Sequence, residues 1–303
     1  MNRSIGPPPT LRCAIDAKTY LGETPIWSPA ERALYWINCE REPMLSRWNA
    51  MDGERENWSM PERIGGVVLK ETGGALVVLA RGLHDFDFLT GELSLRVPSP
   101  LPEHISLHEV QCDRDGRLWV GSINHRLRDT PTLPGGGKLF RLDGDALVSV
   151  VEDINCANGL AFSPDGTRLY LSDSPTSIIE SWTLDRATGS LSERQTFAKV
   201  DPAHGFVDGA TVDSEGGYWA TLVYGAALRR YAPDGAIDRH LALPFSNPTK
   251  VAFAGDDMRT LFITTTKMTP RSGKANLGQD MLGGIYAIES DIAGIPDPLW
   301  RGY

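Results

Sequence analysis

An internal repeat constrains the fold of this chain more than any other feature. Six segments share one pattern: an apolar strand, a tight turn, and a second apolar strand that is often rich in aromatic residues. They begin at Pro25, Val67, Val110, Leu160, Ala210 and Val251. The turns ETGG, DRDG, SPDG and DSEGG contain residues that accept positive φ, as tight hairpins require. Short β-branched and aromatic runs between such turns predict strands.

The spacing of the repeat predicts the architecture. The mid-strand landmarks Trp36, Val78, Trp119, Tyr170, Trp219 and Phe262 lie between 41 and 51 residues apart. Each repeat adds a third strand, and most add a short fourth one. Four strands in a repeat of this length are typical of a propeller blade. We therefore predict an all-β fold, a six-bladed β-propeller with four-stranded blades that occupies residues 1–303 as a single domain.

The stretch LRCAIDAKT, from Leu11, has the composition of a strand but no partner within its own repeat. We expect this N-terminal strand to close the ring by joining the sheet of the last blade. Leucine-rich and hexapeptide solenoids have much shorter periods, and the G-H and W-D signatures of WD40 repeats do not recur here.

Charge and cysteine content exclude several functions. The chain has 30 Lys and Arg against 39 Asp and Glu, a net charge of −9, and it lacks a basic run. Binding to nucleic acid or to an anionic membrane surface is therefore not expected. The sequence contains no run of 18 apolar residues, so we predict no membrane-spanning helix. The four cysteines are widely spaced and never form C-x-x-C, which favours reduced thiols in a cytoplasmic protein.

One register position collects the polar residues of the repeats. The repeats can be aligned without gaps on the sequence NGLAFSPDG of the fourth repeat. The position of its Asn is then held by Glu23, Gly65, His108, Asn158, Asp208 and Thr249. We expect it just before the inner strand of each blade, so that all six residues face one end of the central channel. The oxygens of Glu23, Asn158 and Asp208 suit a hard or borderline divalent cation. Asn-Gly and Asp-Gly are also ordinary turn sequences, but their shared register favours a functional site.

Two further places are candidates for substrate contact. The segment SINHRLRDTPTLPGGG, from Ser122, is the longest insertion between strands, and loops on rigid scaffolds often contact substrates. It contains Asn124. Tyr224 comes just after the second strand of its own repeat, the same place at which the long insertion begins in blade three.

The motifs LGETPIW, NGLAFSPDGTRLYLSDS and VDGATVDSEGGYWAT resemble those of the SMP-30/gluconolactonase/LRE-like family of six-bladed propellers. The resemblance extends over essentially the whole chain. It implies a lactonase that hydrolyses sugar lactones in the cytosol. It also implies that Glu23, Asn158 and Asp208 bind one divalent metal ion; Ca²⁺, Zn²⁺, Mg²⁺, Mn²⁺ and Fe²⁺ all remain open.

The chain departs from this family in blade three. The family motif R-x-N-D-G, whose Arg and Asn contact the lactone, is replaced by the sequence from Ser106 to Val110. Ser106 and His108 therefore occupy the expected substrate-contact positions.

The resemblance implies that the metal polarises the lactone carbonyl while Asp208 acts as general base. An imidazole could share this role near neutral pH, so the catalytic candidates are Asp208 and His108. The substrate-contact candidates are Ser106, His108, Asn124 and Tyr224. Two alternatives to a sugar lactonase stay open: a related metal-dependent hydrolase of another ester, lactone or phosphoester, and a non-catalytic metal- or sugar-binding propeller.

Overall fold

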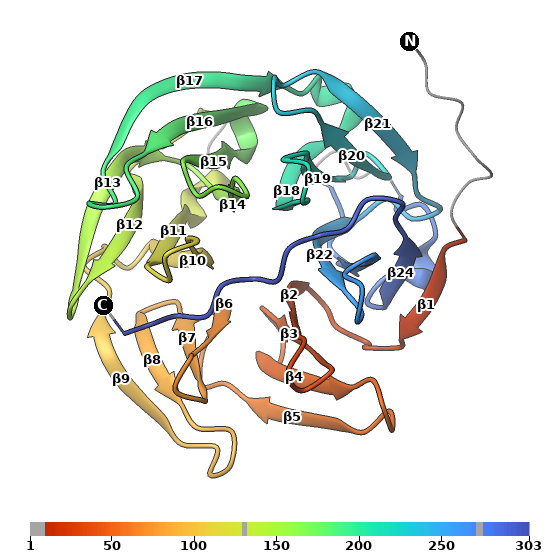
Figure 1. Cartoon of the computed structure of the whole chain (residues 1–303), viewed down its shortest axis with the longest axis horizontal. Coiled ribbons are helices and arrows are strands. Elements are labelled where there is room, and N and C mark those ends of the chain that lie inside the picture. Colours follow the sequence, from red (N-terminus) through yellow and green to blue (C-terminus); the bar gives the residue numbers. More distant parts are fainter. Residues whose placement is uncertain (1–9, 129–131, 271–274, 303) are drawn as a thin grey trace.

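The computed structural model describes residues 10–128, 132–270 and 275–302. Within these residues, 24 strands form six four-stranded antiparallel sheets, arranged as blades around a central channel (Figure 1). The predicted six-bladed β-propeller is thus confirmed.

The blades follow one another along the chain. The first three consist of β2 (Gly22–Ser28), β3 (Ala33–Asn38), β4 (Met44–Asn49) and β5 (Arg55–Ser59); β6 (Ile64–Leu69), β7 (Ala75–Leu79), β8 (Gly82–Phe86) and β9 (Leu93–Pro98); and β10 (Ile105–Cys112), β11 (Leu118–Asn124), β12 (Gly137–Asp143) and β13 (Ala146–Ile154). The next two consist of β14 (Ala157–Phe162), β15 (Arg168–Asp173), β16 (Ile178–Leu184) and β17 (Leu191–Lys199); and β18 (Phe206–Val212), β19 (Tyr218–Val223), β20 (Ala227–Tyr231) and β21 (Ile237–Ala242). The last blade combines β22 (Pro248–Ala254), β23 (Thr260–Thr265) and β24 (Ile285–Glu289) with β1 (Arg12–Ile15). Four short 3₁₀ helices are described: His125–Arg128, Ser174–Thr176, Pro202–His204 and Gln279–Met281.

The N-terminal strand closes the ring, as predicted. β1 pairs antiparallel with β24, where Arg12 faces Ala287 and Cys13 faces Tyr286. Ile15 is buried in the cluster that joins the last blade to the first, which includes Phe262 and Trp36. Strands from the two ends of the chain therefore share one sheet.

Hairpin turns within the blades are held by aspartates. Asp113, in the DRDG turn, accepts backbone N–H bonds from Asp115 and Arg117 at 3.0 Å. Its other carboxylate oxygen accepts the indole N–H of the fully buried Trp119 at 3.0 Å. Asp213 and Trp219 repeat this bond in blade five. The predicted turns therefore also anchor the aromatic residues of the core.

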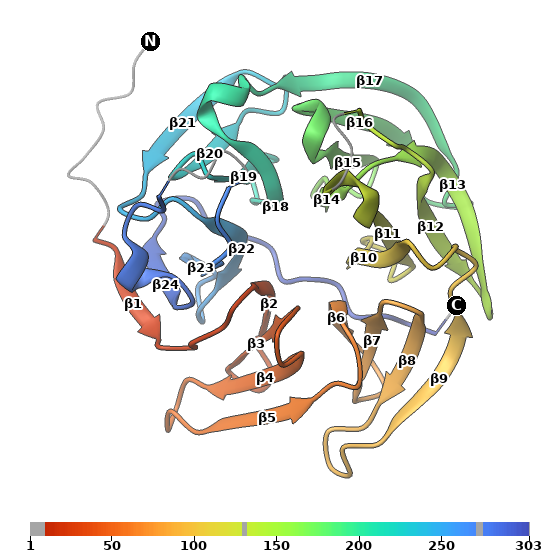
Figure 2. The same cartoon turned by 180° about the vertical axis from the view of Figure 1, so that it is seen from behind.

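Six inner strands line the channel: β2, β6, β10, β14, β18 and β22 (Figures 1 and 2). The C-terminal segment crosses the ring over this channel. It forms isolated bridges from Gly294 to Asp213 and from Trp300 to Lys70. Both partners directly follow the last residue of an inner strand, so the C-terminal segment covers the end of the channel where the inner strands finish. The opposite end, where they start, carries the polar register position.

In the part of the chain that the structure describes, no helix has the length and apolar character needed to cross a membrane.

Ring closure is testable by truncation. A chain that starts at Lys18 lacks β1, so it exposes the edge of β24 and loses the burial of Ile15. We expect its melting temperature to fall by about 5 °C or more. A chain that starts at Thr10 keeps β1 and serves as the control. Equal melting temperatures of the two truncated chains in differential scanning calorimetry would contradict the closure role of β1.

Candidate functional site

The polar register position lies inside the inner strands rather than just before them, which corrects the sequence expectation. Its residues fall among the first four residues of β2, β6, β10, β14, β18 and β22. In each strand the pairing register with the next strand shifts at or beside this position, as in a β-bulge. A bulge disrupts the alternation of side chains, so two successive residues can both face the channel. His108 and Glu109 do so: the first contacts blade four and the second contacts blade six.

Glu23 and Asp208 are the acidic residues at this position. Glu23 is 5% exposed and accepts a backbone N–H bond from Thr24 at 3.0 Å. Burial raises the pKa of Glu23 to about 7, an effect that the positive charge of Lys250 partly offsets and the negative charge of Glu109 reinforces. Burial also raises the pKa of Asp208 well above its ordinary value, and the charges of Glu23 and Glu109 raise it further. Carboxylates crowded in this way require a counter-charge to ionise together.

Asn158 is oriented by hydrogen bonds on its amide nitrogen. Its Nδ2 donates to Ser174 Oγ at 2.9 Å and contacts Cys156 Sγ at 3.6 Å. The carbonyl oxygen Oδ1 lies 3.2 Å from His108 Nε2. Because Oδ1 has two lone pairs, it can accept from His108 and still coordinate a cation.

The ring of His108 contacts Arg63, which directly precedes blade two, and Asn158 of blade four. Its Nδ1 lies 3.2 Å from the guanidinium of Arg63, which can only donate hydrogen bonds. Nδ1 is therefore the acceptor, and the neutral ring carries its proton on Nε2 and donates it to Asn158. Burial lowers the pKa of His108 well below its ordinary value, and the positive charges of Arg63 and Lys250 lower it further. The imidazole is thus neutral, with both nitrogens hydrogen-bonded.

The other predicted substrate-contact residues belong to blades three and five, at the end of the channel where β10 and β18 start. Ser106 is buried, and its Oγ lies 2.8 Å from His125 Nε2. Asn124 ends β11, where its amide donates to Gly135 O at 2.7 Å and accepts from the backbone of Arg126, so it holds the long loop. Residues 129–131 of that loop lie outside the described residues. Tyr224 follows β19 with a φ of 63°, a backbone conformation that is uncommon for a bulky residue.

Three charged residues of this region were not singled out by the sequence. Glu109 and Lys250 each follow the register position by one residue, and regular strand alternation places such side chains away from the channel. Arg63 precedes β6 and reaches across to blade three, where it contacts Leu107 O and His108 Nδ1. Its Nε donates to Glu40 at 3.3 Å. A signal was available for Glu109 and Lys250, because charged residues are unusual within buried inner strands.

The oxygen donors at the mouth fit a divalent cation. Two carboxylates with raised pKa values and one oriented amide oxygen make a hard donor set. Across the described residues, no group of three or more His, Cys, Asp or Glu side chains is arranged to hold a metal ion. The third oxygen at the mouth belongs instead to the amide of Asn158.

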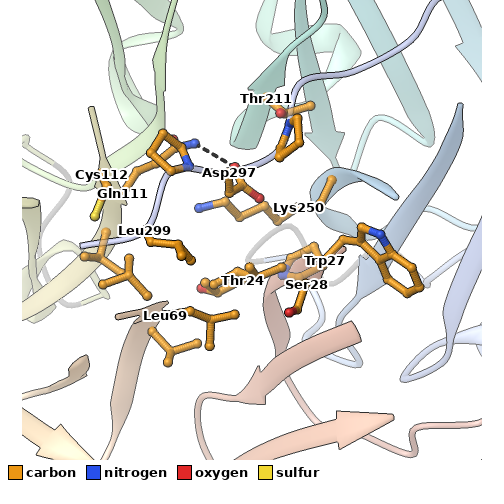
Figure 3. Close-up of a pocket in the computed structure, with 18 of the residues that line it drawn as sticks. Thr24, Trp27, Ser28, Leu69, Gln111, Cys112, Thr211, Lys250, Asp297 and Leu299 are labelled. Carbon is orange, nitrogen blue, oxygen red and sulfur yellow. Dashed lines mark hydrogen bonds between the residues drawn. The ribbon is translucent and has the colours of Figure 1, made fainter. Parts of the chain in front are cut away.

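A cavity of about 280 Å³ lies deeper in the channel, under the C-terminal segment (Figure 3). Apolar residues such as Leu69 and Leu299 form much of its wall, and Lys250 and Asp297 both line it near its centre. Gln111 Nε2 donates to Asp297 Oδ1 at 3.2 Å. Lys250 therefore lies between this cavity and the acidic residues at the mouth.

Comparisons with known proteins agree with this architecture. A 6-deoxy-6-sulfogluconolactonase of Pseudomonas putida is 34% identical over 297 residues, which cover 97% of this chain and 99% of the relative. Pentonolactonase XacC of Haloferax volcanii is 30% identical over 295 residues, or 95% and 97% of the two chains. The crystal structure of a calcium-binding protein, regucalcin, from Agrobacterium tumefaciens superposes with a TM-score of 0.87 at 24% identity, covering 97% of this chain and 98% of the other.

The family model of the SMP-30/Gluconolactonase/LRE-like region matches residues 21–267, most of the propeller. On this match and on the two relatives that are at least 30% identical over nearly their full length, the chain belongs to the SMP-30/Gluconolactonase/LRE-like family.

Proposed function

We propose that this protein is a lactonase that hydrolyses a sugar lactone to the aldonic acid, with one divalent cation held by Glu23, Asn158 and Asp208. Two of its relatives are named 6-deoxy-6-sulfogluconolactonase and pentonolactonase. The single observation that supports the proposal is that the carboxylates of Glu23 and Asp208 and the oriented amide of Asn158 belong to the same end of the channel, where the charge of Glu23 acts on Asp208.

Lactone opening requires a polarised carbonyl, a water nucleophile, an acceptor for the proton of that water, and a proton for the ring oxygen when its bond to the carbonyl carbon breaks. The bound cation would supply Lewis-acid polarisation of the carbonyl. Asp208 is the general base in this proposal as well as a ligand of the cation, because its carboxylate lies at the channel mouth and accepts no hydrogen bond among the described contacts. His108 has no lone pair left for this task while Nδ1 accepts from Arg63.

His108 and Ser106 instead position the substrate. The Nε2–H of His108 holds Asn158 Oδ1, so the imidazole fixes a proposed metal ligand and forms one wall of the site. Ser106 Oγ can donate to a substrate oxygen while it accepts from His125. Asn124 and Tyr224, which belong to loops at the mouth, stay in the proposal as substrate-contact residues.

The proposed partner is a small-molecule sugar lactone, and nucleic acid and membrane are not proposed as partners. We propose the cytoplasm as the location. All four cysteines are free, and Cys39, Cys112 and Cys156 are buried; unpaired thiols are typical of reducing compartments.

An assay of several aldonolactones tests the proposal. Acid release is measured after treatment with chelator and again after separate addition of Ca²⁺, Zn²⁺, Mg²⁺ and Mn²⁺. We expect turnover of at least one lactone, its loss on chelation, and its recovery with metal. Binding of metal or sugar without turnover would favour a non-catalytic propeller. Turnover confined to other esters or phosphoesters would favour the related hydrolase.

Two variants separate the roles of Asp208 and His108. Asp208→Asn removes the proposed base and a charged ligand, so kcat should fall on the order of 10²-fold or more and metal affinity should weaken. His108→Asn keeps a hydrogen-bonding amide, so kcat should stay within about tenfold of the parent while KM rises.

Asp234→Asn is the matched control, since Asp234 lies in an exposed turn of the same blade as Asp208. It should leave rate and metal content unchanged. Full activity of Asp208→Asn would contradict the role of Asp208 as base. A His108→Asn variant that loses kcat as severely as Asp208→Asn would contradict the positioning role of His108.

A further inference from the structure

A second layer of the channel lies directly beneath the proposed cation site. It is formed by the residues that follow the register position in each blade: Thr24, Gly66, Glu109, Gly159, Gly209 and Lys250. Three of these are glycines, and the only two charged residues in this layer come from opposite blades. β10 of blade three and β22 of blade six face each other across the channel in both views (Figures 1 and 2). Their side chains meet in an ion pair across it.

The ion pair is short and buried. Lys250 Nζ lies 2.8 Å from Glu109 Oε1, with side-chain exposures of 7% and 2%. The lysine stem lies over Gly209, where an added Cβ would come within 2.2 Å of Lys250 Cγ. A side chain at position 209 would therefore displace the lysine. The absence of a side chain on Gly209 and the bulge in β22 together let the ammonium group reach Glu109 on the opposite blade.

This ammonium group acts on every acidic residue around it. Its charge favours the ionised forms of Glu23 and Asp208 at the mouth, which otherwise repel each other and Glu109. The charges of Glu109 and Glu23, together with the hydrogen bond to Glu109, raise the pKa of Lys250 above its ordinary value despite burial. The ion pair with Glu109 therefore favours the charged form of Lys250 under the site.

We propose that Lys250 is the built-in counter-cation of the channel: its ion pair with Glu109 keeps that carboxylate away from the metal and confines the divalent cation to Glu23, Asn158 and Asp208. This inference rests on the proposed function, because it concerns the same cation. Lys250 is a positioning residue, acting through Glu109 and through its charge. Glu109 lies beside the proposed cation site, and its carboxylate is engaged by Lys250 instead of by the cation.

Two single variants shift cation affinity in opposite directions. Lys250→Met keeps the length of the side chain but removes the charge, which releases Glu109 toward the site. We expect divalent cations to bind about tenfold more tightly. Glu109→Gln leaves Lys250 charged and without its ionic partner, so binding should weaken by about tenfold. General damage to the channel would weaken binding in both variants, whereas the charge account requires opposite signs.

The double variant Lys250→Met/Glu109→Gln removes both charges and is the control. Its affinity should return to within about threefold of the parent, because the local net charge is unchanged. Isothermal titration with Ca²⁺ and with Mn²⁺ measures affinity and stoichiometry for all four proteins. Equal affinity in the parent and Lys250→Met would overturn this inference alone. No cation binding by any of the four would overturn the proposed metal-dependent function as well.

Melting of the metal-free proteins gives a readout that does not depend on the cation. Lys250→Met leaves an unpaired buried carboxylate and should melt several degrees below the parent, while the double variant recovers most of the loss. Failure of the single variant to fold, with normal folding of the double variant, would equally support the need for a counter-charge. A single variant as stable as the parent would overturn it.

Discussion

The pairing of β1 with β24 is the contact on which the arrangement of the whole molecule depends. An open row of blades would leave two sheet edges, and residues from its ends would stay far apart. Closure brings β2 of the first blade beside β22 of the last, so Glu23 and Lys250 come to share one channel. Closure also brings Glu23 of the first blade to the same channel as Asn158 and Asp208 of the adjacent blades four and five.

Charge in the closed channel explains the rest of the site. Three carboxylates surround a narrow space, and burial together with mutual repulsion raises the pKa of two of them. Lys250 compensates for part of this negative charge, and a divalent cation at the mouth would compensate for more. On the blade-three side, Arg63 and His108 contribute donors without adding a titrating base, because the imidazole stays neutral. The C-terminal segment crosses the opposite end, so we propose the mouth as the side from which a substrate enters.

The sequence predicted the fold well because the information was local and repeated six times. Turn residues, strand composition and a constant register were visible without any tertiary contact, as Asp113 and Asp213 illustrate. The same register identified the six positions at the mouth. It could not place them within their strands, because a bulge depends on pairing with the next strand. The bulge also hid Glu109 and Lys250, whose ion pair joins opposite blades. Arg63 lies in a connection between blades, and nothing in its local sequence indicates that it reaches His108.

In our proposal, one divalent cation sits among Glu23, Asn158 and Asp208, above the Lys250–Glu109 pair. Crystals grown with Mn²⁺ and measured at a wavelength where manganese scatters anomalously would locate the ion directly. The account predicts a single anomalous peak within coordination distance of those three side chains, and Glu109 still paired with Lys250. A peak elsewhere in the channel, or a manganese ion bound by Glu109 in the parent protein, would contradict it.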